Sequence, residues 1–260
     1  MPATERPLER PDYGIDAPGV VRNLFLAGII GVSVWAVTTA TAAFGAVHVP
    51  RLVLRLAGMG FSTGIACGLM GIWMLWDSKI GKLRDRERLL DRIPWSGNEQ
   101  VLDVGCGRGL LLTGAARRLV SGRATGIDIW QAEDLSGNSL EAALENARRE
   151  GVADRVVVQT ADMRTLPFPD STFDVVVSNA AIHNLYHAED RAQAIREIAR
   201  VMKPGGRAVI EDIRHHRQYA NTFSQNGCTI RRAGSMIAYV FLMLITFGSL
   251  RPATLVVRKG

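Results

Sequence analysis

The sequence predicts an α/β protein with a doubly wound, mostly parallel sheet, preceded by a helical hairpin in the membrane. Three observations predict this fold. From Pro94 onward, apolar strands alternate with helical segments, which is typical of parallel strands joined by crossover helices. A glycine-rich turn, Gly105–Gly109, joins the first strand to a helix. Residues 24–47 and 56–76 contain no charged residue, and each run is long enough to cross a bilayer.

The 260 residues divide into four predicted parts, of which the first three precede the sheet. Residues 1–21 are rich in proline and charge and lack apolar periodicity, so we expect a flexible N-terminal tail. Residues 22–76 contain both apolar runs, which we interpret as two transmembrane helices; a pair of buried core helices is the alternative. The second run carries small residues at helical spacing that would let the two helices approach closely: Gly60, Gly64, Gly68 and Gly71.

Residues 77–93 are the third part, a juxtamembrane helix rich in basic residues. These are Lys79, Lys82, Arg84, Arg86, Arg88 and Arg92. The positive-inside tendency therefore predicts that the following domain, and the N-terminal tail with it, lie in the cytosol at the cell (inner) membrane. An apolar face recurs at helical spacing and could rest on lipid headgroups or cover the edge of the sheet. It consists of Ile80, Leu83, Leu90 and Ile93.

Residues 94–260 are the fourth part and contain the predicted sheet. Asp103 closes the first strand just before the glycine-rich turn, and Asp128 stands at the end of the second, about 20 residues on, where such folds bind a ribose. A carboxylate beside the turn would repel a pyrophosphate, and position 110 is Leu where a dinucleotide-binding loop has glycine. The turn therefore suits a ligand that carries positive charge.

The stretch Val101–Gly109 resembles motif I of the class I S-adenosylmethionine (SAM)-dependent methyltransferases. Later motifs follow in the order typical of that family, including Asp162-Met163 after the third strand and Lys203-Pro204-Gly205-Gly206 before the fifth. The resemblance covers about residues 77–260 and implies a seven-stranded sheet with an antiparallel last strand. It implies SAM as cofactor, with Asp128 on the ribose and Asp162 on the adenine amine. The implied cofactor-binding residues are Asp103, Gly105, Cys106, Gly107, Asp128, Ile129, Asp162, Met163 and Asn179.

The residues after the fourth strand, Asn179–Leu185, resemble those of the enzymes that methylate quinones, sterols and phospholipids. This resemblance implies a small, apolar, membrane-resident acceptor such as a quinone or lipid precursor. Two other functions stay open: a protein methyltransferase acting on a membrane partner, and a SAM-binding module without catalysis. His183 is the candidate general base because it follows the fourth strand at the reaction face; a structural, hydrogen-bonded histidine is the alternative.

The remaining features narrow the partners. Residues 234–250 are uncharged but short for a membrane span. We expect them to border the substrate pocket and dip into the bilayer, or to form a core helix or a dimer contact. The net charge of +6 includes no basic stripe interleaved with aromatics, so no nucleic-acid partner is predicted. Three scattered cysteines predict neither a disulfide framework nor a metal site. The oligomeric state is left open.

Overall fold

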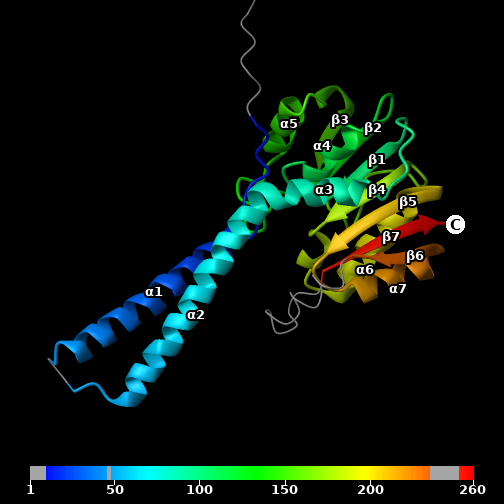
Figure 1. The fold of residues 1–260 in the computed structure, drawn as a ribbon. Helices are drawn as coiled ribbons and strands as arrows, with labels where there is room; N and C mark the ends of the chain where they lie inside the picture. The colour runs from blue at the N-terminus through cyan, green and yellow to red at the C-terminus, as the bar shows by residue number, and fades with distance from the viewer. Residues whose placement is uncertain (1–9, 46–47, 235–251) are drawn as a thin grey trace, which may run out of the picture. The chain divides into compact units, whose positions relative to one another are not determined.

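The computed structural model describes residues 10–45, 48–234 and 252–260, and it divides into two compact units (Figure 1). The first unit contains the sheet and is formed by described residues from 1–13, 83–130 and 137–260. The second unit is formed by described residues from 14–82 together with residues 131–136.

The first unit is built on a single seven-stranded sheet. Its strands are β1 (Gln100–Val104), β2 (Arg123–Asp128), β3 (Val156–Thr160), β4 (Phe173–Asn179), β5 (Met202–Asp212), β6 (Cys228–Ala233) and β7 (Ala253–Lys259). They are arranged in the order β3-β2-β1-β4-β5-β7-β6, in which β1 to β5 pair in parallel and β7 pairs antiparallel with both β5 and β6. The structure confirms the predicted doubly wound, mostly parallel sheet with an antiparallel last strand.

Helices cover the sheet on both faces, as Figure 1 shows. They are α3 (Lys82–Leu90), α4 (Leu110–Ala116), α5 (Leu140–Arg149), α6 (Ala188–Val201) and α7 (His216–Gln225). Neighbouring residues of β1 point to opposite faces, because side chains alternate along a strand. Val101 packs in the core under α3, α4 and α5, whereas Leu102 packs in the core under α6 and α7. The sheet is thus the middle of three layers, and its central strands are apolar on both sides.

The strand order reverses between β1 and β4. From β1 the sheet continues to β2 and β3 in one direction, and to β4 and β5 in the other. Open α/β sheets bind ligands outside the carboxyl ends of the strands at such a switch point. The two strand ends are tied together there, because the Ser178 hydroxyl donates a hydrogen bond to the Val104 carbonyl at 2.8 Å. The fold therefore places a site above the ends of β1 and β4.

The predicted helix of residues 77–93 is a short π-helix, η1 (Asp77–Gly81), followed by α3. Leu90 and Ile93 are buried in the core beside the sheet, as is Leu89, which lies outside the predicted apolar face. Ile80 is instead 45% exposed. Ile80 lies within the π-helix, whereas the two buried residues of the predicted face, Leu90 and Ile93, come after it. Of the two interpretations left open by the sequence, α3 covers the sheet.

The end of the sheet is an antiparallel pair in which β6 pairs with β7 from Cys228 with Lys259 to Ala233 with Thr254. The predicted apolar segment 234–250 comes between these strands in the sequence. Apart from Gly234, it lies outside the described residues. Whether the segment borders the substrate pocket and dips into the bilayer, forms a core helix or forms a dimer contact therefore stays a prediction.

The second unit contains a hairpin of two helices, α1 (Pro18–Ala43) and α2 (Arg51–Trp76). Their backbones approach closely at glycines: a Cβ on Gly31 would lie 2.4 Å from the Gly60 carbonyl oxygen, and one on Gly28 would lie 3.1 Å from that of Gly64. Gly60 and Gly64 belong to the predicted small-residue seam. The seam therefore faces α1, as expected for helices packed through small residues.

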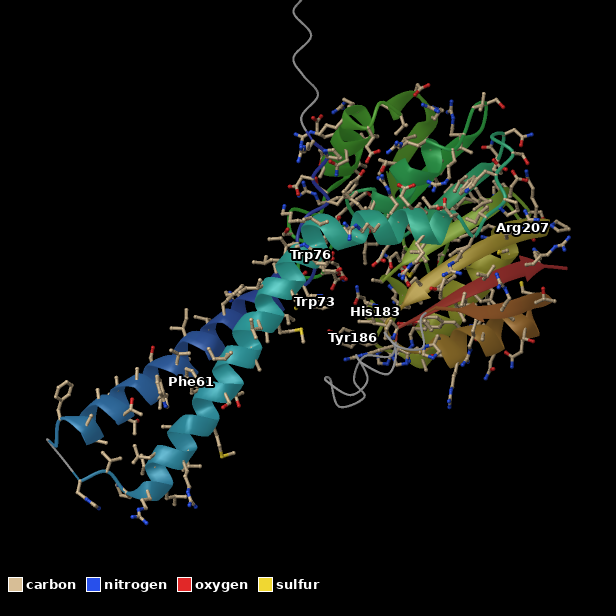
Figure 2. The ribbon with its side chains drawn as sticks, viewed as in Figure 1. Phe61, Trp73, Trp76, His183, Tyr186 and Arg207 are labelled. Atoms are coloured by element: carbon tan, nitrogen blue, oxygen red, sulfur yellow. The ribbon has the colours of Figure 1, made fainter. Side chains whose placement is uncertain are left out.

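Both helices are long and apolar enough to cross a membrane, judged by length and composition alone. Only 11% of the residues in the apolar stretch of each helix are buried, so both helices leave large aliphatic side chains uncovered. Trp73 and Trp76 lie on the last turns of α2 and are 44% and 47% exposed (Figure 2). A helix buried in the core of a soluble protein would cover these side chains.

The predicted flexible tail, residues 1–21, is ordered in its second half. Tyr13 is only 5% exposed and packs in the first unit, and α1 already begins at Pro18. Within the second unit, the Ile15 amide donates to the Ser136 hydroxyl at 2.7 Å, and the Ser136 amide donates to the Ile15 carbonyl at 3.0 Å. The sequence did not indicate this order, because the partners of these residues lie far away in the sequence and leave no local pattern.

Candidate functional site

The glycine-rich turn after β1 adopts a conformation that requires glycine. Gly105, Gly107 and Gly109 have φ angles of 71°, 53° and 84°, in the left-handed region that other residues disfavour. A Cβ on Gly105 would also lie 2.3 Å from the Cβ of Ala181. The turn therefore passes directly beside the residues that follow β4, and position 105 has no room for a side chain.

Asp103 in β1 is a buried carboxylate just before this turn. It is 2% exposed, and its Oδ2 has no hydrogen-bond partner among the residues that the structure describes. Burial, with a smaller contribution from the nearby carboxylate of Asp128, raises the pKa of Asp103 to about 8. A buried oxygen without a partner suits a ligand that brings an N–H donor or a positive charge, as the sequence predicted.

Cys106, another predicted cofactor residue, is 5% exposed within the turn. Burial raises the pKa of its thiol well above the usual value, so the thiol stays protonated at neutral pH. Its Sγ lies so close to β2 that a Cβ on Gly126 would be 2.9 Å away. Cys106 therefore packs as a small apolar side chain and is unsuited to act as a nucleophile.

Asp128 at the end of β2 holds the turn through backbone amides. Its Oδ2 accepts a hydrogen bond from the Gly107 amide at 2.8 Å, and its Oδ1 accepts one from the Trp130 amide at 2.7 Å. The side chain of Asn138 also donates to Oδ1 at 3.5 Å. Trp130 has a φ of 62°, and its indole donates to the Thr160 hydroxyl at 2.8 Å. The carboxylate is thereby fixed at the end of the strand, beside the turn.

Two further predicted cofactor residues lie at the same edge. Ile129 follows Asp128 and is 46% exposed, so it offers an apolar surface there. Asn179 is the last residue of β4 and pairs with Glu211 of β5. Both positions agree with a ligand above the carboxyl ends of the strands, although neither side chain makes a contact that defines its role.

Asp162 and Met163 follow β3, and their side chains have different neighbours. The side chain of Met163 lies next to the turn, 3.6 Å from where a Cβ on Gly105 would be. The carboxylate of Asp162 instead pairs with the Arg164 guanidinium at 2.6 Å, and the hydrogen bonds from Arg164 lower the pKa of Asp162. Arg164 also contacts Asp190 at 3.3 Å. Met163 is therefore placed for the predicted role, whereas Asp162 is engaged by a neighbouring cation.

His183 lies in a short 3₁₀ helix, η3 (Ile182–Asn184), after β4 (Figure 2). Its Nδ1 lies 2.6 Å from Oδ1 of Asp212, and its amide donates to the other oxygen at 3.0 Å. Asp212 ends β5 with its side chain 1% exposed, and it also accepts hydrogen bonds from the Ile213 amide and the Tyr219 hydroxyl. Burial and Asp212 raise the pKa of Tyr219 far above its usual value, so this hydroxyl remains a donor.

Three residues of this edge are not among the site residues predicted from the sequence: Trp130, Asn138 and Asp212. Asp212 had a usable signal, because it closes a predicted strand just as Asp103 and Asp128 do. Trp130 and Asn138 had none, since a loop and the start of a helix carry no periodicity that points to a neighbouring strand end.

A doubly wound sheet with a glycine-rich turn after β1 and acidic residues at the ends of β1 and β2 is the arrangement found in class I methyltransferases. Residues 102–210 match the methyltransferase domain family, which covers the chain from β1 to most of β5. This range includes His183 and every predicted cofactor residue, but it stops before Asp212. Residues 102–210 are therefore similar to a methyltransferase domain.

Relatives support the same domain. The chain is 42% identical over 130 residues to the methyltransferase GfsG of Streptomyces halstedii, covering 50% of this chain and 43% of that one. It is 36% identical over 125 residues to the demethylmenaquinone methyltransferase of Lactiplantibacillus plantarum, covering 48% and 49%. The chain thus spans about half the length of these relatives.

A solved structure shares the fold. The geranyl diphosphate methyltransferase in complex with SAM superimposes with a TM-score of 0.54, at 19% identity, over 68% of this chain and 85% of that one. At this identity the likeness establishes the sheet architecture alone.

Proposed function

We propose that the protein is a SAM-dependent methyltransferase of the cell (inner) membrane, anchored by α1 and α2 with the sheet domain in the cytosol. Its acceptor is a small apolar molecule that resides in the membrane, such as a quinone or lipid precursor. The observation that carries the proposal is buried Asp103 beside the glycine-rich turn. Its unpartnered oxygen suits a positively charged methyl donor.

The residues at the ends of β1, β2 and β3 fit SAM. Asp103 would accept the ammonium group, and Asp128 would accept the ribose hydroxyls beside the Gly107 amide. Met163 would pack against the adenine next to the turn. Asp162 would receive the adenine amine, and this role requires Arg164 to share or release the carboxylate. The fit is therefore good at three positions and requires one side chain to rearrange.

Bound SAM supplies an already activated methyl group, so the protein chiefly has to align donor and acceptor. His183 would take the proton from an acceptor hydroxyl or acidic carbon. Asp212 faces Nδ1, which leaves Nε2 for the acceptor, and its buried charge would stabilise the imidazolium that forms. An acceptor that loses such a proton, for example the phenol of a reduced quinone, therefore fits this pair of residues best.

The membrane location is supported by the hairpin. Its two helices have the length and composition of membrane spans, and most of their apolar surface is uncovered in the part of the chain that the structure describes. Water would oppose such exposure, whereas lipid would not. A quinone acceptor is supported by the demethylmenaquinone methyltransferase among the relatives. A membrane-resident acceptor also gives the anchor a purpose, since it concentrates the enzyme beside its substrate.

The test uses the full chain in detergent micelles, methyl-labelled SAM and a lipid extract from membranes. We expect label in the organic phase together with S-adenosylhomocysteine, and neither product from a reaction without the protein, which serves as the blank. Label in the protein fraction instead would indicate a protein methyltransferase. No S-adenosylhomocysteine above the blank would indicate a SAM-binding module without catalysis.

The same protein tests the anchor when it is expressed in cells. Membranes washed with alkaline carbonate should retain the chain, because two spanning helices resist a wash that removes peripheral proteins. Release into the supernatant would contradict the transmembrane interpretation without touching the methyltransferase assignment.

A further inference from the structure

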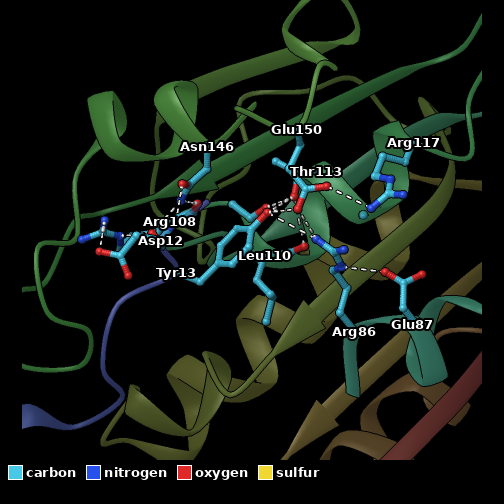
Figure 3. Close-up of polar contacts among 12 residues, drawn as sticks. Asp12, Tyr13, Arg86, Glu87, Arg108, Leu110, Thr113, Arg117, Asn146 and Glu150 are labelled. Atoms are coloured by element: carbon cyan, nitrogen blue, oxygen red, sulfur yellow. Dashed lines mark hydrogen bonds and ion pairs between the residues drawn. The ribbon is translucent and has the colours of Figure 1, made fainter. Parts of the chain in front are cut away.

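We propose that Asp12 and Tyr13, in the segment just before the first apolar helix, are positioning residues for the cofactor turn. Asp12 contacts Arg108 in the glycine-rich turn, and Tyr13 contacts Thr113, whose hydroxyl oxygen lies 2.8 Å from the Gly109 carbonyl oxygen of the same turn (Figure 3). The inference rests on the assignment of this turn to SAM. It goes further, because it gives a function to a segment that lies outside the residues matched to the methyltransferase domain.

Asp12 binds the side chain of Arg108, which stands between two glycines of the turn. The Arg108 guanidinium donates from Nε to the Asp12 carbonyl at 2.8 Å and from Nη2 to the Asp12 carboxylate at 3.1 Å. It also donates from Nη1 to the Gly137 carbonyl at 3.2 Å. Its side chain is only 17% exposed. Three donors of one guanidinium are thus committed to fixed acceptors, which restrains the residue at the centre of the turn.

The side chain of Asn146 in α5 binds the backbone of both Asp12 and Arg108. It is 1% exposed, and its Oδ1 accepts a hydrogen bond from the Asp12 amide at 2.9 Å. Its Nδ2 donates to the carbonyl of Asp12 at 2.8 Å and to the carbonyl of Arg108 at 2.9 Å. One buried amide therefore binds the backbone of both partners, which fixes the distance between the N-terminal segment and the turn.

Tyr13 contacts the helix that follows the turn. Its hydroxyl accepts a hydrogen bond from the Thr113 hydroxyl at 2.7 Å, and the same Thr113 oxygen lies 2.8 Å from the Gly109 carbonyl oxygen. The Tyr13 hydroxyl also donates to the Glu150 carboxylate at 2.6 Å, and Arg86 donates to the same oxygen at 2.7 Å. The side chains of Arg86 and Glu150 are 5% and 6% exposed. A buried ion pair thus holds the ring in place, and the ring in turn holds the first turn of α4.

These contacts matter for binding because glycine leaves the turn free to move. Three glycines in five residues give a backbone with many accessible conformations, and a ligand must select one of them. Asp128 restrains the turn through the Gly107 amide, and Asp12 restrains it through the Arg108 side chain. We therefore expect the N-terminal segment to improve SAM affinity while leaving the methyl-transfer rate at saturating SAM unchanged.

The experiment measures the SAM dissociation constant by calorimetry for the full chain in detergent micelles. Asp12→Ala should raise this constant about two- to fivefold, because it removes one charge-assisted contact that is partly exposed to water. Arg108→Ala should raise it at least as much, and the double variant should be no worse than Arg108→Ala alone, since both changes break one contact. Asp12→Asn, which keeps an acceptor oxygen, should recover most of the affinity.

Asp91→Ala is the matched control. Asp91 pairs with Arg118 at 2.6 Å, and the Arg118 side chain is 18% exposed, which is close to the value for Arg108. This control should change SAM affinity by less than the error of the measurement. A shift in the unfolding midpoint without a change in SAM affinity for Asp12→Ala would mean that the contact is merely structural, and the proposal would be wrong.

Two further variants keep the proposal testable whatever the first ones do. A chain lacking residues 1–13 removes the whole segment and should lose more affinity than Asp12→Ala; equal affinity to the wild type would overturn the proposal. Asp128→Ala is measured in parallel. If Asp128→Ala also leaves SAM affinity intact, the assignment of the cofactor site fails. If it weakens SAM while Asp12→Ala does not, only the role of Asp12 fails.

Discussion

The proposed cofactor half and the proposed acceptor half of the carboxyl edge are held together in different ways. In the cofactor half, at the ends of β1, β2 and β3, the Asp128 carboxylate binds backbone amides of the turn and of Trp130. In the acceptor half, at the ends of β4 and β5, the Asp212 carboxylate lies against the ring of His183. The same chemical group therefore shapes a backbone in one half and orients an ionisable side chain in the other.

This difference predicts which half tolerates amino-acid substitutions without loss of the fold. A backbone cradle depends on glycines and on one carboxylate, so it serves one ligand and tolerates little variation. A side chain held by a buried carboxylate can be exchanged for another while the strands stay in place. We therefore expect changes in the acceptor half to affect the rate of methyl transfer, and changes in the cofactor half to affect SAM affinity.

The largest expected effect comes from His183→Ala. If His183 removes a proton from the acceptor, its loss should lower kcat by roughly 10²- to 10⁴-fold. The SAM dissociation constant should stay within about twofold of the wild type, because His183 belongs to the acceptor half. Rates of S-adenosylhomocysteine formation and calorimetric SAM titrations, measured on the same preparations, check both statements.

His187→Ala is the control for this prediction, since His187 lies four residues on and is exposed. It should retain the wild-type rate. A His183→Ala protein that keeps its full rate would show that the pair of His183 and Asp212 is structural, which is the alternative that the sequence left open.

A smaller effect is expected from Asp128→Ala in the cofactor half. Loss of charge-assisted hydrogen bonds costs about 1.5–3 kcal/mol, so SAM affinity should fall roughly ten- to a hundredfold. Part of this loss arises from the released Gly107 amide, which Asp128 holds at 2.8 Å. Calorimetry on the full chain measures the change.

Asp174→Ala is a matched control at the other end of the sheet. Its carboxylate also accepts a backbone hydrogen bond, from the Gln100 amide at 2.8 Å, and it pairs with Lys203. This variant should lose stability without a change in SAM affinity. Equal loss of affinity in the two variants would mean that Asp128 acts through the fold and does not contact the ribose.

Local patterns were sufficient to predict the sheet. Strands such as β1 and β4 are apolar runs that end at glycine or at a turn, and the helices between them show helical spacing. The π-helix at Asp77–Gly81 was not predicted, and Ile80 within it is exposed although it belongs to the predicted apolar face. A change in the number of residues per turn leaves no compositional signal.

The site was predictable where it depends on backbone and less so where it depends on distant side chains. Glycines and strand-end acids identified Asp103 and Asp128, because their spacing in the sequence reflects one strand-turn-helix unit. Asp212 lies 29 residues from its partner His183, and only the sheet brings the two together. Tyr13 is farther still from Thr113, and a charged, proline-rich surrounding gave no reason to expect a buried ring.

The last expected effect concerns Asp103 and the pH dependence of stability without SAM. Burial raises the pKa of Asp103 to about 8, whereas an aspartate in the unfolded chain titrates near 3.9. Between these values the folded protein keeps a proton that the unfolded chain has lost, so stability falls as pH rises through this range and levels off above about 8. Asp103→Asn cannot ionise and removes this contribution.

We therefore expect Asp103→Asn to gain stability over the wild type as pH increases from 5 to 8, by about 1 kcal/mol per pH unit. Chemical unfolding of both proteins at several pH values measures the difference. Saturating SAM should reverse the order, because its positive charge favours the ionised carboxylate that only the wild type supplies. Parallel pH profiles for the two proteins would contradict the raised pKa. If saturating SAM leaves the order of stability of the two proteins unchanged, Asp103 does not contact SAM.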